Sequence, residues 1–466
     1  MKRVLIVALL ASAALIAQSF DRTKPPEPSA PHPYKLPPVF EARLLNGLTV
    51  VLVEDARVPL VTVRLAFHCG NRRDPKELPG LASAVADLMT QATSTRGFIQ
   101  IVEAVDTMGG SLNASSGADH VAVNGSIESE NLAPLLDIMA DVAKNAEFSD
   151  IDLRLYKQNR KQTLARQFAQ NSYIANYVFR QVLFGDHPYS HIGPTYDSLD
   201  RLTHQALVDY RNIWLVPNNG FLIMVGRLPP RADTLKMIAE RFGAWERKTL
   251  PEVKRELAPA PAKRLILIDR PGAAQVDVRI GRIAATQRDP DYFAEWAGSI
   301  IVGGVPLGRM FLDLREKRGF AYDVRTEHVA FNEAGILSST IQVRNEVAGD
   351  AIRAMIEHLD RMASEPVTPK ELSDAKSSVA GSFLLHLETQ AGLADELMVN
   401  AIQELGPGFL ESWRTGMEAV KAEDVQAAAK KFLATQDSLV VVVGDASKIQ
   451  ESLTGIGKLE IVKAGN

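Results

Sequence analysis

Residues 43–70, RLLNGLTVVLVEDARVPLVTVRLAFHCG, decide how this chain folds. The Asn46-Gly47 pair favours a tight turn between two runs rich in β-branched residues, so we expect two or three strands joined by hairpins. Residues 264–284, RLILIDRPGAAQVDVRIGRIA, repeat the same pattern of strands in the second part of the chain. The repetition predicts two copies of one folding unit.

The repeat continues beyond these opening strands. Residues 220–238, GFLIMVGRLPPRADTLKMI, follow a predicted helix, and residues 439–453, LVVVVGDASKIQESL, follow another in the same order. Helical patterns occupy the sequence between the strands, including residues 151–184 in the first copy and residues 369–405 in the second. We therefore predict an α+β fold of two homologous halves, each an α/β sandwich with an antiparallel sheet and flanking helices.

The joint between the halves is predicted at residues 251–263, PEVKRELAPAPAK, because this segment is charged and rich in alanine and proline. The first half then spans residues 40–250 and the second spans residues 264–466. Each half is long enough to bury a core of its own.

The composition is that of a soluble globular protein. The chain has 466 residues, of which 46% are hydrophobic and 23% are charged. The formal net charge of -4 gives no sign of a nucleic-acid partner or of an anionic surface as a partner. Cys69 is the single cysteine, which excludes an intramolecular disulfide and a zinc site built from cysteines.

Residues 1–19 have the pattern of a signal peptide. Lys2 and Arg3 precede an apolar run that ends in small residues, so we expect cleavage near Ser19. This predicts an exported protein, periplasmic or secreted, with no integral membrane span after signal cleavage; an uncleaved N-terminal anchor is the alternative. Residues 20–39 are rich in proline and are predicted to form an extended linker.

Residues 303–324, GGVPLGRMFLDLREKRGFAYDV, carry the clearest functional pattern. A glycine-rich loop leads into a helical segment with Met310, Phe311 and Leu314 on one face, and the helix breaks at Gly319. Arg315 and Tyr322 lie at the two ends of this break. A guanidinium group and a phenol held near each other are donors suited to a backbone carbonyl or a carboxylate.

These segments together resemble the pitrilysin or insulinase family of metallopeptidases, family M16, which includes the mitochondrial processing peptidases. The resemblance rests on NGLTVVLVED at 46–55, the glycine-led helix at Gly80, GGSLNA at 109–114, GDHPYSHIGPT at 185–195 and the segment 303–324. It implies two halves that form a clam shell around a chamber, in which an unfolded peptide adds as a strand to the edge of a sheet.

The zinc motif of the family is absent. Members carry His-x-x-Glu-His on a helix, with a third ligand on a later helix. At the matching positions this chain has Ser83, Ala86 and Asp87, and there is no Asp or Glu between Leu153 and Gly185. We therefore predict a degenerate zinc site, with no catalytic residue, no metal and no cofactor in this chain.

Could other histidines hold a metal instead? His187 and His191 are four residues apart, but Pro188 and Gly193 prevent the helix that would bring them to one face. A packed or surface loop is the favoured interpretation.

The resemblance assigns substrate binding to two segments. Arg315 and Tyr322 match an Arg and Tyr pair that one chain of heterodimeric relatives contributes to hold the substrate backbone. Asn113, Ala114 and Ser115 match the edge strand that takes up the peptide. The alternatives are that Arg315 only caps its helix and pairs with a neighbouring carboxylate, that Tyr322 packs in a sheet, and that the strand edge is vestigial.

The leading hypothesis is a non-catalytic, substrate-binding subunit of an exported heterodimeric zinc metallopeptidase. Its partners would be an M16-type catalytic subunit that carries His-x-x-Glu-His, with zinc in that chain, and an unfolded peptide. A catalytically dead, homodimeric scaffold or peptide-binding protein of the same fold is the alternative. An autonomous peptidase with a relocated metal site is the least favoured hypothesis.

Overall fold

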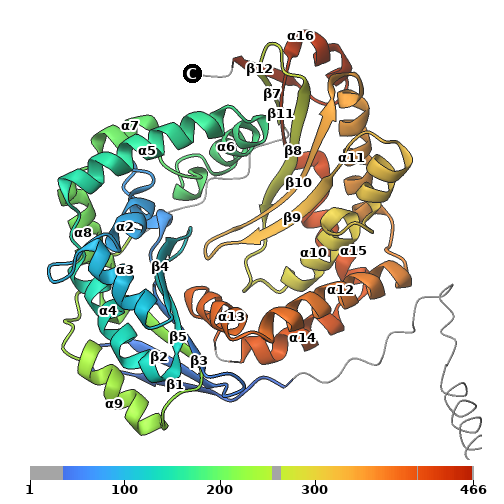
Figure 1. The fold of residues 1–466 in the computed structure, drawn as a ribbon. Helices are drawn as coiled ribbons and strands as arrows, with labels where there is room; N and C mark the ends of the chain where they lie inside the picture. Colours follow the sequence, from blue (N-terminus) through green and yellow to red (C-terminus); the bar gives the residue numbers. More distant parts are fainter. Residues whose placement is uncertain (1–34, 254–263, 407, 464–466) are drawn as a thin grey trace, which may run out of the picture. The chain divides into compact units, whose positions relative to one another are not determined.

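The computed structural model describes residues 35–253, 264–406 and 408–463 (Figure 1). The predicted signal peptide at 1–19 lies outside the described residues, as do most of the linker at 20–39 and residues 254–263 of the linker between the halves.

The first half is built on a six-stranded sheet with the strand order β1-β2-β6-β3-β5-β4. Its strands are β1 (Val39–Arg43), β2 (Thr49–Glu54), β3 (Leu60–Phe67), β4 (Ser111–Ser116), β5 (Val121–Glu128) and β6 (Gly220–Gly226). The predicted hairpin at Asn46-Gly47 joins β1 to β2, and Gly47 has a φ of 95°, a left-handed conformation that favours glycine. The predicted hairpin between β2 and β3 is wrong, because β6 lies between them, parallel to β2 and antiparallel to β3.

The second half repeats this order in a sheet with the order β12-β7-β11-β8-β10-β9. Its strands are β7 (Arg264–Asp269), β8 (Gln275–Ala284), β9 (Val324–Ala330), β10 (Gly335–Arg344), β11 (Leu439–Gly444) and β12 (Leu459–Lys463). Strands β7, β11, β8, β10 and β9 correspond in order to β2, β6, β3, β5 and β4. The outer strand differs, because β1 begins its half and is antiparallel to β2, whereas β12 ends its half and is parallel to β7.

The first half has its own set of helices, most of which bury one extended apolar core against the first sheet. They are α2 (Leu81–Met89), α3 (Phe98–Thr107), α4 (Leu132–Asn145), α5 (Asp150–Phe168), α6 (Asn171–Phe184), α7 (Tyr196–Arg201), α8 (His204–Trp214) and α9 (Arg231–Phe242). The predicted helix over 151–184 is divided at Ala169 and Gln170 into α5 and α6.

The second half has its own core and its own set of helices. They are α10 (Tyr292–Ser299), the π-helical segments η5 (Ile300–Gly304) and η6 (Phe311–Lys317), α11 (Ala348–Ser364), α12 (Pro369–Leu387), α13 (Gln390–Ile402), α14 (Phe409–Ala419), α15 (Ala422–Phe432) and α16 (Ala446–Ile449). The predicted helix over 369–405 is divided into α12 and α13, because Thr389 caps the start of α13.

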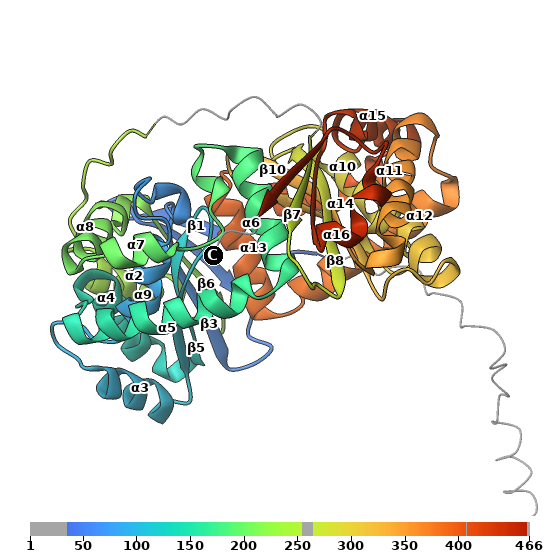
Figure 2. The ribbon, with the colours of Figure 1, turned by 90° about the horizontal axis from the view of Figure 1, so that it is seen from above.

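Two helices pack on the sheet of the other half (Figures 1 and 2). Helix α6 belongs to the first half in sequence, yet its Ile174, Phe179 and Leu183 form a core with Ile266 and Val441 of the second sheet. Helix α13 lies against β3 and β6 of the first sheet. The halves therefore exchange one helix in each direction, and Pro37–Asn466 form one compact unit.

Polar contacts anchor α13 on the first half. The Arg64 guanidinium pairs with Asp395 at 2.7 Å, and the Gln390 amide donates to the Asp55 carbonyl oxygen at 2.9 Å. Both bonds join residues of different halves, so α13 has a fixed position on the first sheet.

The loop between β9 and β10 contacts the first half through a buried polar network. Glu333 accepts from Arg72 at 3.0 Å and lies 2.7 Å from His187 Nε2, and the side chains of Arg72 and His187 are almost fully buried. The Asn332 backbone amide donates to Asp119, which also accepts from the Tyr189 hydroxyl. The expected packed or surface loop at His187 is thus a packed one.

Within the described ranges, no helix combines the length and the apolar character that a membrane crossing requires.

Candidate functional site

The three positions of the expected zinc motif lie on α2 as predicted, but they hold no set of metal ligands. Ser83 donates a hydrogen bond to Asn71 at 3.3 Å and accepts one from Ser116 at 3.0 Å. Ala86 is buried in the core of the first half. Two of the three positions therefore serve packing and local hydrogen bonding.

Asp87 is on the solvent side of α2, facing Tyr156 and Arg160 of α5. Partial burial raises the pKa of the Asp87 carboxyl, and the positive charge of Arg160 opposes that rise. Burial and the charge of Asp87 together raise the pKa of Tyr156 well above its usual range. Ser83, Ala86, Asp87, Tyr156 and Arg160 are called the α2–α5 corner below.

Zinc does not fit the α2–α5 corner. One carboxylate is the only good ligand, a guanidinium group stands beside it, and a phenol that stays protonated occupies the helix opposite. In the part of the chain that the structure describes, no group of three or more His, Cys, Asp or Glu side chains is arranged to hold a metal ion.

Arg315 and Tyr322 are brought together by the structure. The guanidinium carbon of Arg315 lies 4.9 Å from the centre of the Tyr322 ring and 4.7 Å from the centre of the Phe311 ring. Two aromatic rings therefore flank the guanidinium group and restrict its orientation. Arg315 and Tyr322 are called the η6–β9 rim below.

The polar atoms of the η6–β9 rim are accessible. Tyr322 is 84% exposed, and among the described residues its hydroxyl has no hydrogen-bond partner. Arg315 is half-buried, with its Nε 3.4 Å from Glu316 in a loose ion pair. The expected alternative of a pair with a neighbouring carboxylate thus holds in part, whereas Tyr322 does not pack in a sheet.

Packing beneath the rim explains its position. The predicted apolar face of Met310, Phe311 and Leu314 is buried, although the segment is π-helical instead of α-helical. Gly303 approaches β9 so closely that a Cβ at this position would lie 2.7 Å from the Thr326 hydroxyl. The glycine-rich loop therefore packs tightly against the strand that follows Tyr322.

Asn113, Ala114 and Ser115 lie on β4, the outer strand of the first sheet, which pairs only with β5 among the described strands. Asn124 of β5 donates to the side chains of both Asn113 and Ser115 at 3.0 Å. The other edge of β4 leaves main-chain groups available, so strand addition is geometrically open there.

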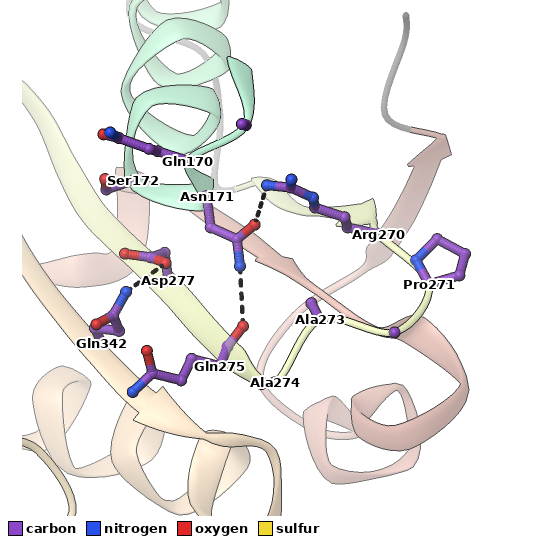
Figure 3. Close-up of a pocket in the computed structure, with 12 residues that line it drawn as sticks. Gln170, Asn171, Ser172, Arg270, Pro271, Ala273, Ala274, Gln275, Asp277 and Gln342 are labelled. Atoms are coloured by element: carbon purple, nitrogen blue, oxygen red, sulfur yellow. Dashed lines mark hydrogen bonds between the residues drawn. The ribbon is translucent and has the colours of Figure 1, made fainter. Parts of the chain in front are cut away.

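A polar cleft that the sequence did not indicate lies between α6 and the second sheet (Figure 3). Its main cavity has a volume of about 640 Å³, and a second cavity of about 320 Å³ shares Ser172, Asp277 and Gln342 with it. Asp323, the residue after Tyr322, lines the second cavity. We call the two cavities together the Asp277 cleft; sequence periodicity could not reveal it, because α6 reaches it from the other half.

His68 has a structural role in the junction between the halves. It contacts Asn332 at 3.0 Å and Arg72 at 2.7 Å, and burial together with Arg72 and Arg73 lowers the pKa of its imidazole to about 3. The ring is therefore neutral at physiological pH, as a buried and hydrogen-bonded histidine.

Two family profiles match the chain. Residues 49–183 match the profile described as insulinase, peptidase family M16, and residues 201–379 match the one described as peptidase M16 inactive domain. An uncharacterized zinc protease of Mycobacterium tuberculosis is 26% identical over 417 residues, which cover 87% of this chain and 93% of the relative. An uncharacterized zinc protease of Bacillus subtilis is 21% identical, with 85% and 96% of the two chains covered.

Solved structures show the same fold. The peptidase M16 inactive domain from Pseudomonas fluorescens has a TM-score of 0.82 at 22% identity and covers 87% of this chain and 98% of its own. A protease from Helicobacter pylori has a TM-score of 0.81 at 18% identity, with 88% and 100% covered. The predicted fold class, α+β with two homologous halves in a clam shell, is thereby confirmed. The chain belongs to peptidase family M16, the insulinase family.

Proposed function

We propose that this protein is a non-catalytic, substrate-binding subunit of an exported zinc metallopeptidase. The observation that supports this most directly is the contact between Arg315 and Tyr322 at an exposed rim, with the Tyr322 hydroxyl free to donate. The α2–α5 corner supports the non-catalytic part, because its side chains do not fit zinc. The metal would belong to a partner chain with an intact His-x-x-Glu-His.

The chemistry of the rim suits an extended peptide. The guanidinium group only donates hydrogen bonds, and the phenol hydroxyl can donate one, so both groups match the carbonyl oxygens of a peptide. The rings of Phe311 and Tyr322 hold the Arg315 guanidinium before any peptide arrives. Donors placed in advance stabilise developing negative charge on a carbonyl oxygen without a cost of reorganisation.

The outer strand β4 supports a peptide-binding role in a second way. A peptide that adds to its edge would bind mainly through main-chain hydrogen bonds, which give affinity with little dependence on sequence. Asn113 and Ser115 would then border the bound strand, held in place by Asn124.

The test is to produce this chain together with an M16-type chain that carries the intact zinc motif. Zinc content and the cleavage of a quenched fluorescent peptide are measured for each chain alone and for the complex. Arg315→Ala is expected to lower turnover of the complex by roughly 10²-fold or more, and Tyr322→Phe by less. Arg353→Ala and Tyr196→Phe are the controls, because both side chains are exposed and lie elsewhere.

Three results would contradict the proposal. Unchanged turnover with Arg315→Ala excludes the donor role. A stable homodimer that binds peptide and does not associate with any M16 chain supports the scaffold alternative. Stoichiometric zinc and peptide cleavage by this chain alone support an autonomous peptidase.

A further inference from the structure

The Asp277 cleft adjoins the η6–β9 rim. Its main cavity is lined by the start of α6, the turn between β7 and β8, the start of β8 and the end of β10 (Figure 3). Its second cavity continues along β8 and β10 to Asp323, which follows Tyr322 directly. A volume of about 640 Å³ is in the range of sites that bind small ligands, roughly 300–1,000 Å³.

Asp277 is a buried carboxylate in this cleft and has no cationic partner among the described residues. It is 7% exposed, and its side chain accepts one hydrogen bond, from the Gln342 amide at 3.1 Å. Burial raises the pKa of Asp277, and only the Gln342 hydrogen bond opposes the rise. The one hydrogen-bond partner of Asp277 among the described residues is a neutral amide, so the carboxylate has no counter-ion there.

The other charged groups of the cleft have different partners. Arg270 donates to Asn171 at 2.6 Å, and Arg279 donates to Ser338 at 2.8 Å. Asp323 pairs with Arg325 at 2.5 Å. None of these arginines neutralises Asp277.

The start of α6 adds main-chain donors to the same cavity. Gln170 precedes the helix without capping it through its side chain, and Asn171 and Ser172 line the cleft. Amides of an uncapped first turn suit a peptide carbonyl oxygen. The cleft therefore offers donors for a peptide backbone and one carboxylate for a cationic side chain.

We propose that the Asp277 cleft binds a lysine or arginine side chain of an extended peptide, with Asp277 as its counter-ion. The inference rests on the proposed peptide-binding function and adds a preference for basic residues to it. The peptide would pass the η6–β9 rim, and the basic side chain would enter the cleft beside Asp323 and reach Asp277.

The test measures direct binding of two fluorescent peptides to the isolated chain by anisotropy. The peptides are unfolded and identical, except that lysines in one are norleucines in the other. The lysine peptide is expected to bind roughly 10- to 100-fold more tightly, the range of a hydrogen-bonded charge in a protected site. Asp277→Asn is expected to remove most of this difference in affinity and to leave the affinity for the norleucine peptide unchanged.

Two further variants make the result specific. Asp106→Asn removes an exposed carboxylate of α3, so it controls for the attraction of a cation by the net charge of -4. Ser172→Lys places a positive charge in the cleft from the exposed start of α6, so it should lower the affinity for the lysine peptide and not for the norleucine peptide. This variant keeps the test decisive even if Asp277→Asn folds poorly.

The inference is overturned if the wild-type chain binds both peptides equally, or if the preference for lysine persists in both Asp277→Asn and Ser172→Lys. Arg315→Ala separates it from the proposed function. If Arg315→Ala lowers the affinity for the norleucine peptide, and the wild-type chain binds the lysine peptide no more tightly than the norleucine peptide, the cleft proposal alone fails. If Arg315→Ala changes neither affinity while the Asp277-dependent preference remains, the role of the rim fails and the cleft stands.

Discussion

The α2–α5 corner belongs to the first half and the η6–β9 rim to the second, and the two differ in whether their polar groups are accessible. In the first half, Ala86 is buried and the Tyr156 hydroxyl is enclosed without a hydrogen-bond partner among the described residues. In the second half, Tyr322 is exposed and its hydroxyl is free to bind. One scaffold thus holds a closed corner and an open rim.

Under the proposed function, a repeated fold would keep a binding role in one half without a zinc site in the other. A zinc site needs several ligands at fixed positions, so replacement of most of them removes it. A pair of donors needs only a local contact, which the break between Arg315 and Tyr322 supplies within one segment. The following predictions test this comparison, in order of decreasing effect.

The largest effect is expected from restoring metal ligands to the α2–α5 corner. Ser83→His with Asp87→His gives two imidazoles one helical turn apart, which bind zinc weakly. Adding Tyr156→Glu supplies a carboxylate from α5 that faces position 87 and should raise the affinity roughly 10³-fold, since four ligands together contribute about 10–16 kcal/mol. Competition with a chromophoric chelator measures both constants.

Tight zinc binding by the double variant alone would contradict this prediction. It would mean that the corner already contains a third ligand, or that Arg160 does not repel the metal ion. The comparison between a closed corner and an open rim would then lose its physical basis.

The second prediction concerns α10, the counterpart of α2 in the repeat. Glu295 of α10 is fully buried, and burial raises the pKa of its carboxyl to about 8, opposed by the hydrogen bond from the Ala285 amide. Below pH 4.5 the carboxyl is protonated in the folded and unfolded states and has no net effect. As pH rises from there to about 8, only the unfolded state ionises, so stability falls.

Glu295→Gln should remove this loss. We expect it to match the wild type near pH 4 and to be more stable above pH 8 by about 5 kcal/mol. Urea unfolding across this pH range measures the difference, with Glu411→Gln at an exposed position of α14 as the control. A pH profile that Glu295→Gln leaves unchanged would show that Glu295 is ionised in the folded state.

A third prediction contrasts the two tyrosines. Tyr156→Phe removes a buried hydroxyl without a hydrogen-bond partner among the described residues and should stabilise the fold by about 1 kcal/mol. Tyr322→Phe removes an exposed hydroxyl and should change the free energy of unfolding by less than about 0.5 kcal/mol. Chemical denaturation compares the two, and a destabilised Tyr156→Phe would reveal a partner for that hydroxyl.

The smallest effect is a change in one pKa. Arg160→Gln removes the positive charge that opposes the raised pKa of Asp87, so that pKa should rise further. Carboxyl carbon NMR titration detects the change. Lys157→Gln, on the same helix, is the control and should leave the Asp87 titration in place. An unchanged pKa in Arg160→Gln would show that the two side chains do not face each other in solution.

Sequence patterns predicted the parts of the site that depend on neighbours along the chain. The Asn46-Gly47 turn, the buried face of Met310, Phe311 and Leu314, and the absence of ligands at Ser83 and Ala86 could all be read from residue identity and spacing. Arg315 and Tyr322 are seven positions apart with a glycine break between them, so their proximity was also accessible. Whether they hold a substrate stays a prediction.

The sequence by itself thus determined the repeat of strands and helices, the loss of the zinc ligands and the local Arg and Tyr pair, because short-range periodicity and side-chain chemistry encode them. Only the tertiary structure decided that β6 enters between β2 and β3, that α6 and α13 pack on the opposite sheets, and that Asp277 lies in a cleft. These features join segments far apart in the chain. The apolar faces of these helices and strands could be buried against the sheet of either half, so the choice between the two sheets depends on how the whole chain packs.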